Sequence, residues 1–156
     1  MNNIKHAWSV LTQSSVIDQA SNNLSMQNII EQLQVSISEK ASAAFKLEHP
    51  EIGNVLPVNF PMQIISLWRS INPNIIPSGD VEIDVFDNIG DLVQKINFKL
   101  QFEAGKGRMR TLITIPAVNI TDTGLYLFKV KLKEEEQDSF IEVAEIPFEV
   151  LFIKEA

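Results

Sequence analysis

Cysteine is absent from this sequence of 156 residues, and histidine is almost absent. Without cysteine the chain forms no disulfide and has no thiolate metal ligand or thiol nucleophile, which fits a reducing cytosol. The two histidines, His6 and His49, lie in separate segments, and neither has a zinc-ligand spacing. His6 shares its parity with Ile4 and Trp8, so we expect a packed histidine rather than the base of a triad. The sequence therefore predicts no enzyme and no cofactor.

Long apolar runs and a basic leader are also missing. Residues 1–8 lack the basic segment and long apolar core of a secretory signal. No apolar run approaches the ~18 residues that a membrane-spanning helix needs. The net charge is −7, with 20 acidic residues against 13 basic ones, and such a chain is repelled by nucleic-acid phosphates and anionic lipids. We expect a cytoplasmic protein that binds neither nucleic acid nor membranes.

What the sequence does contain is a repeated alternation of apolar and polar residues. This two-residue period is typical of half-buried strands, with the apolar side chains turned toward a core. Lysines and acids occupy much of the opposite parity, among them Glu82 and Asp84, which we expect to be solvated. The predicted inner residues of three segments are Val81, Ile83 and Val85; Leu92, Ile96, Phe98, Leu100 and Phe102; and Tyr126, Phe128, Val130 and Leu132.

About eight runs are typical of strands, at the spacing of a two-sheet sandwich in one domain that covers residues 1–156. The helical spacing in 24–37 also fits an amphipathic helix, but its flanks favour a strand. A short inserted helix or loop is expected near 38–56. A bulge near 144–147 explains a change of apolar parity and accommodates Pro147. The runs are 4–16, 24–37, 58–69, 81–86, 91–103, 109–115, 125–133 and 140–153.

The most specific local motif is DTGLYLF at 122–128. It resembles the D-x-G/A-x-Y-x-C stretch of immunoglobulin domains, in which the tyrosine hydroxyl bonds nearby backbone and fixes a corner between sheets. Here Tyr126 takes the place of that tyrosine, and Phe128 takes the place of the cysteine. Trp68 is a candidate for the buried tryptophan of such domains. The resemblance implies an all-β, immunoglobulin-like sandwich and no particular chemistry.

Further segments carry a second resemblance: 7–11 (AWSVL), 23–26 (NLSM), 29–31 (IIE), 85–90 (VFDNIG), 124–130 (GLYLFKV) and 143–150 (VAEIPFEV). They resemble a family of small bacterial β-sandwich proteins known only as a domain of unknown function. The resemblance spans most of the chain except the insertion near 38–56. It implies an immunoglobulin- or C2-like sandwich without established active-site residues.

Two surface features are candidate binding sites. Glycines flank Lys106 at 105–107, where exposed backbone N–H groups can form an anion-binding nest. Arg108 and Arg110 alternate after it, so these three basic residues are a possible contact for an anion or an acidic partner. Leu125 and Leu127 share the parity of the strand's lysines, which predicts an apolar contact patch on an outer face.

These features favour a non-enzymatic interaction module with a protein partner or a second copy of the chain. The edges of a sandwich's sheets can pair with a partner strand, which suits this role. The alternative is a domain that binds a small ligand or calcium through the loops at one end of the sandwich. Asp80, Asp87 and Asp91 are the acids near predicted strand ends, although Asp87 also suits a turn closed by Gly90.

Overall fold

The computed structural model describes residues 2–38 and 55–155, and within these ranges every regular element is a strand. The all-β class is therefore confirmed, but the expectation of eight strands is wrong. There are eleven in the described part: β1 (Ile4–Ile17), β2 (Leu24–Ile29), β3 (Gln32–Ser38), β4 (Leu56–Val58), β5 (Met62–Ser70), β6 (Ser78–Phe86), β7 (Leu92–Gln101), β8 (Arg108–Ile115), β9 (Val118–Ile120), β10 (Gly124–Glu134) and β11 (Ile141–Glu155).

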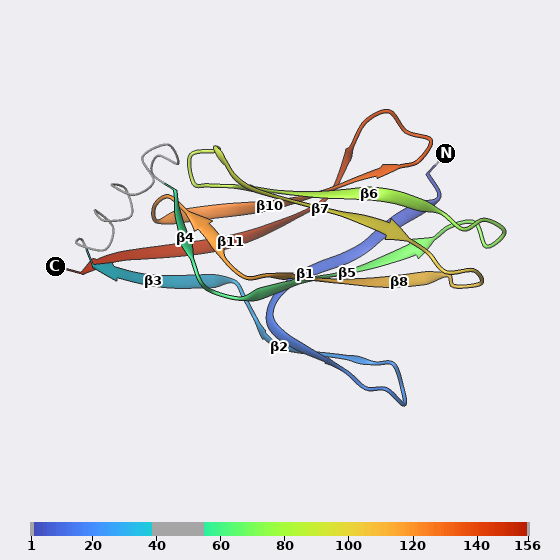
Figure 1. Ribbon diagram of the computed structural model, residues 1–156, viewed down its shortest axis with the longest axis horizontal. Coiled ribbons are helices and arrows are strands. Elements are labelled where there is room, and N and C mark those ends of the chain that lie inside the picture. Colours follow the sequence, from blue (N-terminus) through green and yellow to red (C-terminus); the bar gives the residue numbers. More distant parts are fainter. Residues whose placement is uncertain (1, 39–54, 156) are drawn as a thin grey trace.

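The strands form two large sheets and one small one. The four-stranded sheet has the order β2-β1-β5-β8, the five-stranded sheet has the order β3-β11-β10-β6-β7, and β4 pairs with β9. All neighbours are antiparallel except β3 and β11, which are parallel. The two large sheets lie face to face (Figure 1), and a single apolar cluster takes residues from both. The arrangement is sandwich-like.

The predicted inner faces of β6 and β10 are confirmed. Their alternate apolar side chains are all less than a tenth exposed, and they form the centre of the core with Phe148 of β11 and Trp68 of β5. Trp68 is fully buried, and its indole N–H donates to the Thr111 hydroxyl at 3.0 Å. The two-residue period thus selected the correct face wherever a strand is regular.

In β7 the prediction fails at one residue. Leu100 is buried as expected, but Leu92 is 50% exposed. The register between β6 and β7 shifts between Val85 and Phe86. This irregularity turns Val93 rather than Leu92 toward the core, because one extra residue in a strand reverses the parity of what precedes it.

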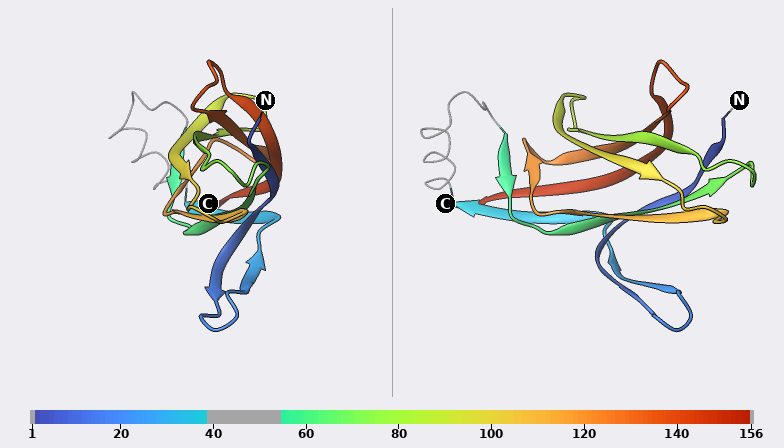
Figure 2. Two further views of the ribbon diagram at one scale, coloured as in Figure 1. Left: turned by 90° about the vertical axis from the view of Figure 1, so that its right-hand side faces the viewer. Right: turned by 45° about the vertical axis from the view of Figure 1, so that its right-hand side comes forward.

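Residues 24–37 form two strands in different sheets. The strand interpretation is correct and the helical alternative is wrong, but the chain leaves the four-stranded sheet after Ile29 and enters the five-stranded one at Gln32. Asn28 has a positive φ of 55° close to this crossing, a conformation that asparagine tolerates better than most residues. Together β1 and β2 form a hairpin that projects from the sandwich (Figure 2).

The predicted change of phase in β11 is present. The register with β10 shifts at Val143, just before the predicted segment 144–147. Pro147 is accommodated for a separate reason. Because the N–H of Glu149 faces β3 and donates to the carbonyl of Glu31 at 2.9 Å, the nitrogen of Pro147 faces the same side. There β3 has not yet begun, so the N–H that proline lacks has no ladder partner to lose.

The short helix or loop predicted near 38–56 falls mainly on residues 39–54, which lie outside the described residues. The strand β4 begins at Leu56, the last residue of that predicted insertion.

The hydrogen-bonded corner predicted at Tyr126 is present. Its hydroxyl donates to the carbonyl of Asp122 at 2.7 Å and accepts the N–H groups of Thr121 and Asp122 at 2.9 and 3.1 Å. The side chain is fully buried, and its ring meets the edge of Phe148 at a centroid distance of 6.0 Å. Phe128, at the position where the immunoglobulin motif that the sequence resembles has a cysteine, is also fully buried.

We expect Tyr126→Phe to lower the free energy of unfolding by about 2 kcal/mol. The ring and its packing stay, but two part-buried backbone N–H groups lose their acceptor, and an unsatisfied donor costs about 1–3 kcal/mol when it is fully buried. Urea denaturation of wild type and variant measures the difference. An unchanged midpoint would show that water replaces the hydroxyl at no cost.

Candidate functional site

Basic and acidic residues are distributed unequally between the two large sheets. The four-stranded sheet contains Lys5, Arg69, Arg108 and Arg110 and no Asp or Glu. In the five-stranded sheet, by contrast, acids on β6, β10 and β11 accompany the lysines. Since the whole chain has a net charge of −7, the four-stranded sheet is a positive region on an acidic protein.

Three of these basic side chains form a row across the sheet. Lys5 of β1 lies opposite Arg69 of β5, and Arg69 lies opposite Arg108 of β8. All three are exposed, and no ion pair involves them within the described residues. Directly opposed like charges are destabilising in a sheet. Because the repulsion within this row lowers the stability of the fold, we interpret the row as a binding surface.

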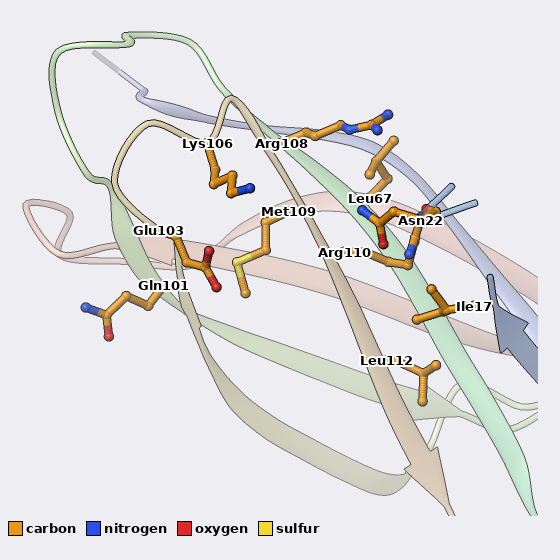
Figure 3. A pocket seen from close by; sticks show the side chains of 10 residues that line it. All are labelled: Ile17, Asn22, Leu67, Gln101, Glu103, Lys106, Arg108, Met109, Arg110 and Leu112. Atoms are coloured by element: carbon orange, nitrogen blue, oxygen red, sulfur yellow. The ribbon is translucent and has the colours of Figure 1, made fainter. Parts of the chain in front are cut away.

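A groove of about 480 Å³ lies beside this row (Figure 3). The three predicted basic residues, Lys106, Arg108 and Arg110, all line it, so the structure brings them together in one site. Asn22, from the turn of the β1–β2 hairpin, also contributes to the wall. The rest of the lining of this basic groove is one acid, Glu103, which stands against the three basic residues, together with Gln101 and four apolar side chains from β1, β5 and β8: Ile17, Leu67, Met109 and Leu112.

Arg110 occupies a special position within the basic groove. One terminal nitrogen, Nη2, donates to the backbone carbonyl of Asn22 at 3.2 Å and so connects β8 to the hairpin turn. Its Nε atom is buried and has no hydrogen-bond partner within the described residues. A buried donor without an acceptor is costly, and a carboxylate is the acceptor that best fits a guanidinium.

Two lysines of the five-stranded sheet, by contrast, have acidic partners. Lys95 lies 3.1 Å from Glu82 and 3.7 Å from Asp84, while Lys131 bonds Asp84 and lies 3.5 Å from Glu82. The hydrogen bond that the Lys131 ammonium donates to the Asp84 carboxylate raises the pKa of Lys131. Asp84 is only 3% exposed, so the expectation of a solvated residue was wrong. It is covered by the two lysines that it pairs with.

The predicted apolar patch lies elsewhere. Leu125 is 55% exposed and Leu127 is half-buried, on the outer face of β10 in the five-stranded sheet. Leu127 pairs with Pro147 of β11 on one side and with Phe86 of β6 on the other, and Phe86 pairs in turn with Leu92 of β7. These residues form an apolar row on a different sheet from the basic groove, so the two predicted surface features do not form one site.

The acids considered for calcium do not converge. Asp80 is at the start of β6, whereas Asp87 and Asp91 are beyond its other end. Asp87 is occupied by turn bonds: its carboxylate accepts the N–H groups of Ile89 and Asp91 at 3.1 and 2.8 Å and the Thr121 hydroxyl at 2.9 Å. Among the described residues, no three His, Asp or Glu side chains are grouped to hold a metal.

His6 belongs to a polar chain inside the four-stranded sheet. Its Nε2 lies 2.7 Å from the hydroxyl of Ser9, which lies 2.6 Å from the hydroxyl of Ser66, and the imidazole meets the Trp68 ring at 5.1 Å. A register shift separates His6 from Trp8, so their expected common face is wrong. No carboxylate bonds the imidazole within the described residues, so this group lacks the acid of a triad.

Burial of His6 predicts a pH dependence of folding. Burial lowers the pKa of His6 from 6.5, so the unfolded chain binds the proton more readily than the folded chain. The free energy of unfolding should fall as the pH drops below about 6.5 toward the lower folded-state pKa, and His6→Gln should remove this component. Urea denaturation of both proteins at about pH 7.5 and 5.5 measures it. Parallel changes in the two proteins would contradict the prediction.

The comparisons with known proteins do not place the chain in a family. No family model matches the sequence, and no curated protein matches it. In the described residues, no helix is long and apolar enough to cross a membrane.

Proposed function

We propose that this protein is an interaction domain that binds an acidic protein partner through the outer face of its four-stranded sheet. The observation that carries the proposal is the charge distribution: a sheet with four basic residues and no acid, in a chain of net charge −7. Complementary charge steers partners to such a surface and determines their orientation.

The basic groove gives this surface more than charge. Leu67 and Leu112 lie beside Arg108 and Arg110 in one hollow, and Leu112 is 37% exposed. Specific interfaces combine apolar contact at the centre with polar and charged contact around it.

We also propose that the sandwich is immunoglobulin-like and related to the small bacterial β-sandwich family of unknown function. The Tyr126 corner, the buried Trp68 and the buried Phe128 in place of a cysteine support the first point. The second rests on the sequence segments that resemble the family. Domains of this architecture bind through loops, sheet faces or sheet edges, so the proposal is compatible with a non-catalytic role.

The test measures binding of polyglutamate, used as a generic acidic polypeptide, by isothermal titration. Arg69→Gln/Arg108→Gln removes two adjacent exposed charges of the row. Each exposed ion pair contributes up to about 1 kcal/mol, so the affinity should fall about tenfold. Added salt should weaken wild-type binding in the same direction.

The matched control is Lys99→Gln/Lys133→Gln, which removes two charges from the five-stranded sheet. It should retain the wild-type affinity. Equal losses in both double variants would show an effect of net charge alone and would overturn the proposal, as would absence of binding to the wild type.

A further inference from the structure

We infer that the acidic partner binds as an extended strand added to the free edge of β8. This inference rests on the proposed function and specifies how the partner is held. The strand β8 ends the four-stranded sheet, with β5 on one side and no strand on the other within the described residues. Such an edge is a template for strand addition, in which backbone hydrogen bonds provide affinity and alternate side chains provide specificity.

The hydrogen-bond register identifies the free backbone groups. The N–H of Ser70 donates to the carbonyl of Gly107 at 2.9 Å, so this opposed pair is hydrogen-bonded. The β5–β8 register then continues without a shift, and hydrogen-bonded pairs alternate in antiparallel strands. The N–H and C=O groups that face away from β5 therefore belong to Arg108, Arg110, Leu112 and Thr114.

The same four residues present their side chains on one face. Figure 3 shows Arg110 and Leu112 on the side of Ile17 and Leu67, and Met109 on the other side of β8. Since residues from both faces of β8 line the basic groove, the hollow follows the edge of the strand. An added strand would lie in it with its backbone against β8 and alternate side chains beside the two arginines.

Charge complementarity favours a different protein over a second copy of this chain. In the described part of another copy the sheet edges are β2, β3, β7 and β8 of the large sheets and β4 and β9 of the small one, and none of these strands contains an Asp or Glu. An edge of a second copy would therefore offer no carboxylate to Arg108 and Arg110. A partner strand with acids at alternate positions would meet both.

The register also predicts the sequence pattern of the partner. Residues opposite Arg108, Arg110, Leu112 and Thr114 lie on one face of the added strand. In antiparallel pairing, the more common arrangement, the partner chain runs opposite to β8, so its residues meet these four in reverse order. The expected partner pattern from N to C terminus is a β-branched residue, an apolar residue and two acids, each separated by one residue.

The test uses a synthetic peptide, Thr-Thr-Ile-Thr-Glu-Thr-Glu, and the variant Thr114→Pro. Proline removes the outward N–H of residue 114 and leaves the ladder to β5 intact, which an edge strand tolerates. We expect a loss of about tenfold in peptide affinity, because a backbone bond is lost and the proline ring hinders close approach. The control Thr114→Val, which keeps the backbone N–H, should bind like the wild type.

A second measurement does not depend on a variant. Peptide binding should slow amide hydrogen exchange at Arg110 and Leu112 by about tenfold or more, since these N–H groups become bonded. Unchanged exchange at both amides with the peptide bound, or equal affinity of Thr114→Pro and wild type, would overturn the strand-addition model. A wild-type dimer in sedimentation that Thr114→Pro converts to a monomer would indicate pairing of β8 with a second copy and would overturn it as well.

The two proposals fail in different ways. If the wild type binds neither polyglutamate nor the peptide, the proposed function is wrong. The other outcome is that the wild type binds both ligands, with affinity lost in Arg69→Gln/Arg108→Gln but not in Thr114→Pro. In that case the proposal of an acidic partner stands, and the proposal that it binds as an added strand is wrong.

Discussion

Replacement of Phe128 by alanine is expected to lower the free energy of unfolding by about 4 kcal/mol, because loss of a buried ring removes its transfer free energy and leaves a cavity. Phe128 is fully buried at the centre of β10. Its ring meets that of Phe148 edge-on at 5.7 Å, and β10 is bonded to β6 on one side and β11 on the other. The surrounding strands therefore have little freedom to close the space.

The control for this prediction is Leu125→Ala in the same strand. Leu125 is 55% exposed, so its truncation should change stability by no more than about 0.5 kcal/mol. Urea denaturation at neutral pH, followed by tryptophan fluorescence, measures both. Similar effects of the two substitutions would mean that the inner and outer faces of β10 are assigned wrongly.

Gly124→Ala is expected to cost about 3 kcal/mol, for a steric reason at the start of β10. Gly124 has a φ of +148°, and a Cβ built there would lie 2.4 Å from the Cβ of Asn88. A contact with a Cβ atom cannot be relieved by a rotamer change, so backbone must move. Overpacking of this kind costs about 1–3 kcal/mol, and the strained φ costs a similar amount.

Two variants separate the steric part from the conformational part. Gly90 has a positive φ of 91°, and nothing lies within 4 Å of a Cβ built there. Gly90→Ala should therefore lower the free energy of unfolding only by the conformational cost of about 1 kcal/mol. Asn88→Gly/Gly124→Ala removes the clashing atom and should recover the steric part. If the double variant is as unstable as Gly124→Ala alone, the contact with Asn88 is not the cause.

Much of the fold could be predicted from alternation because burial of one face imposes it directly. The inner residues of β6 and β10, the turn at Asp87 and the corner at Tyr126 depend on neighbours close in sequence. The failures occur where a strand is irregular. Extra residues in the β1–β5 and β6–β7 ladders reversed the parity of Trp8 and Leu92, and nothing local in the sequence marks those positions.

The candidate site was predicted only in part for a related reason. Lys106, Arg108 and Arg110 are close in sequence, so their grouping was visible. Lys5 and Arg69 join them through strand register alone. Sheet membership, which separates the basic strands from the acidic ones, depends on which distant segments pair, and no single-sequence pattern specifies that.

The parallel pairing of β3 with β11 has a consequence for synthesis on the ribosome. Gln32 pairs with Glu149, so β3 emerges long before β11, its neighbour in the sheet. At about 5–20 residues per second, a separation of this size corresponds to a delay of roughly 6–23 s. During that time Leu33 and Val35, which are buried in the folded chain, have no β11 to pack beside. A pause or premature release before β11 leaves an open apolar edge, so aggregation of incomplete chains is the characteristic failure of this topology.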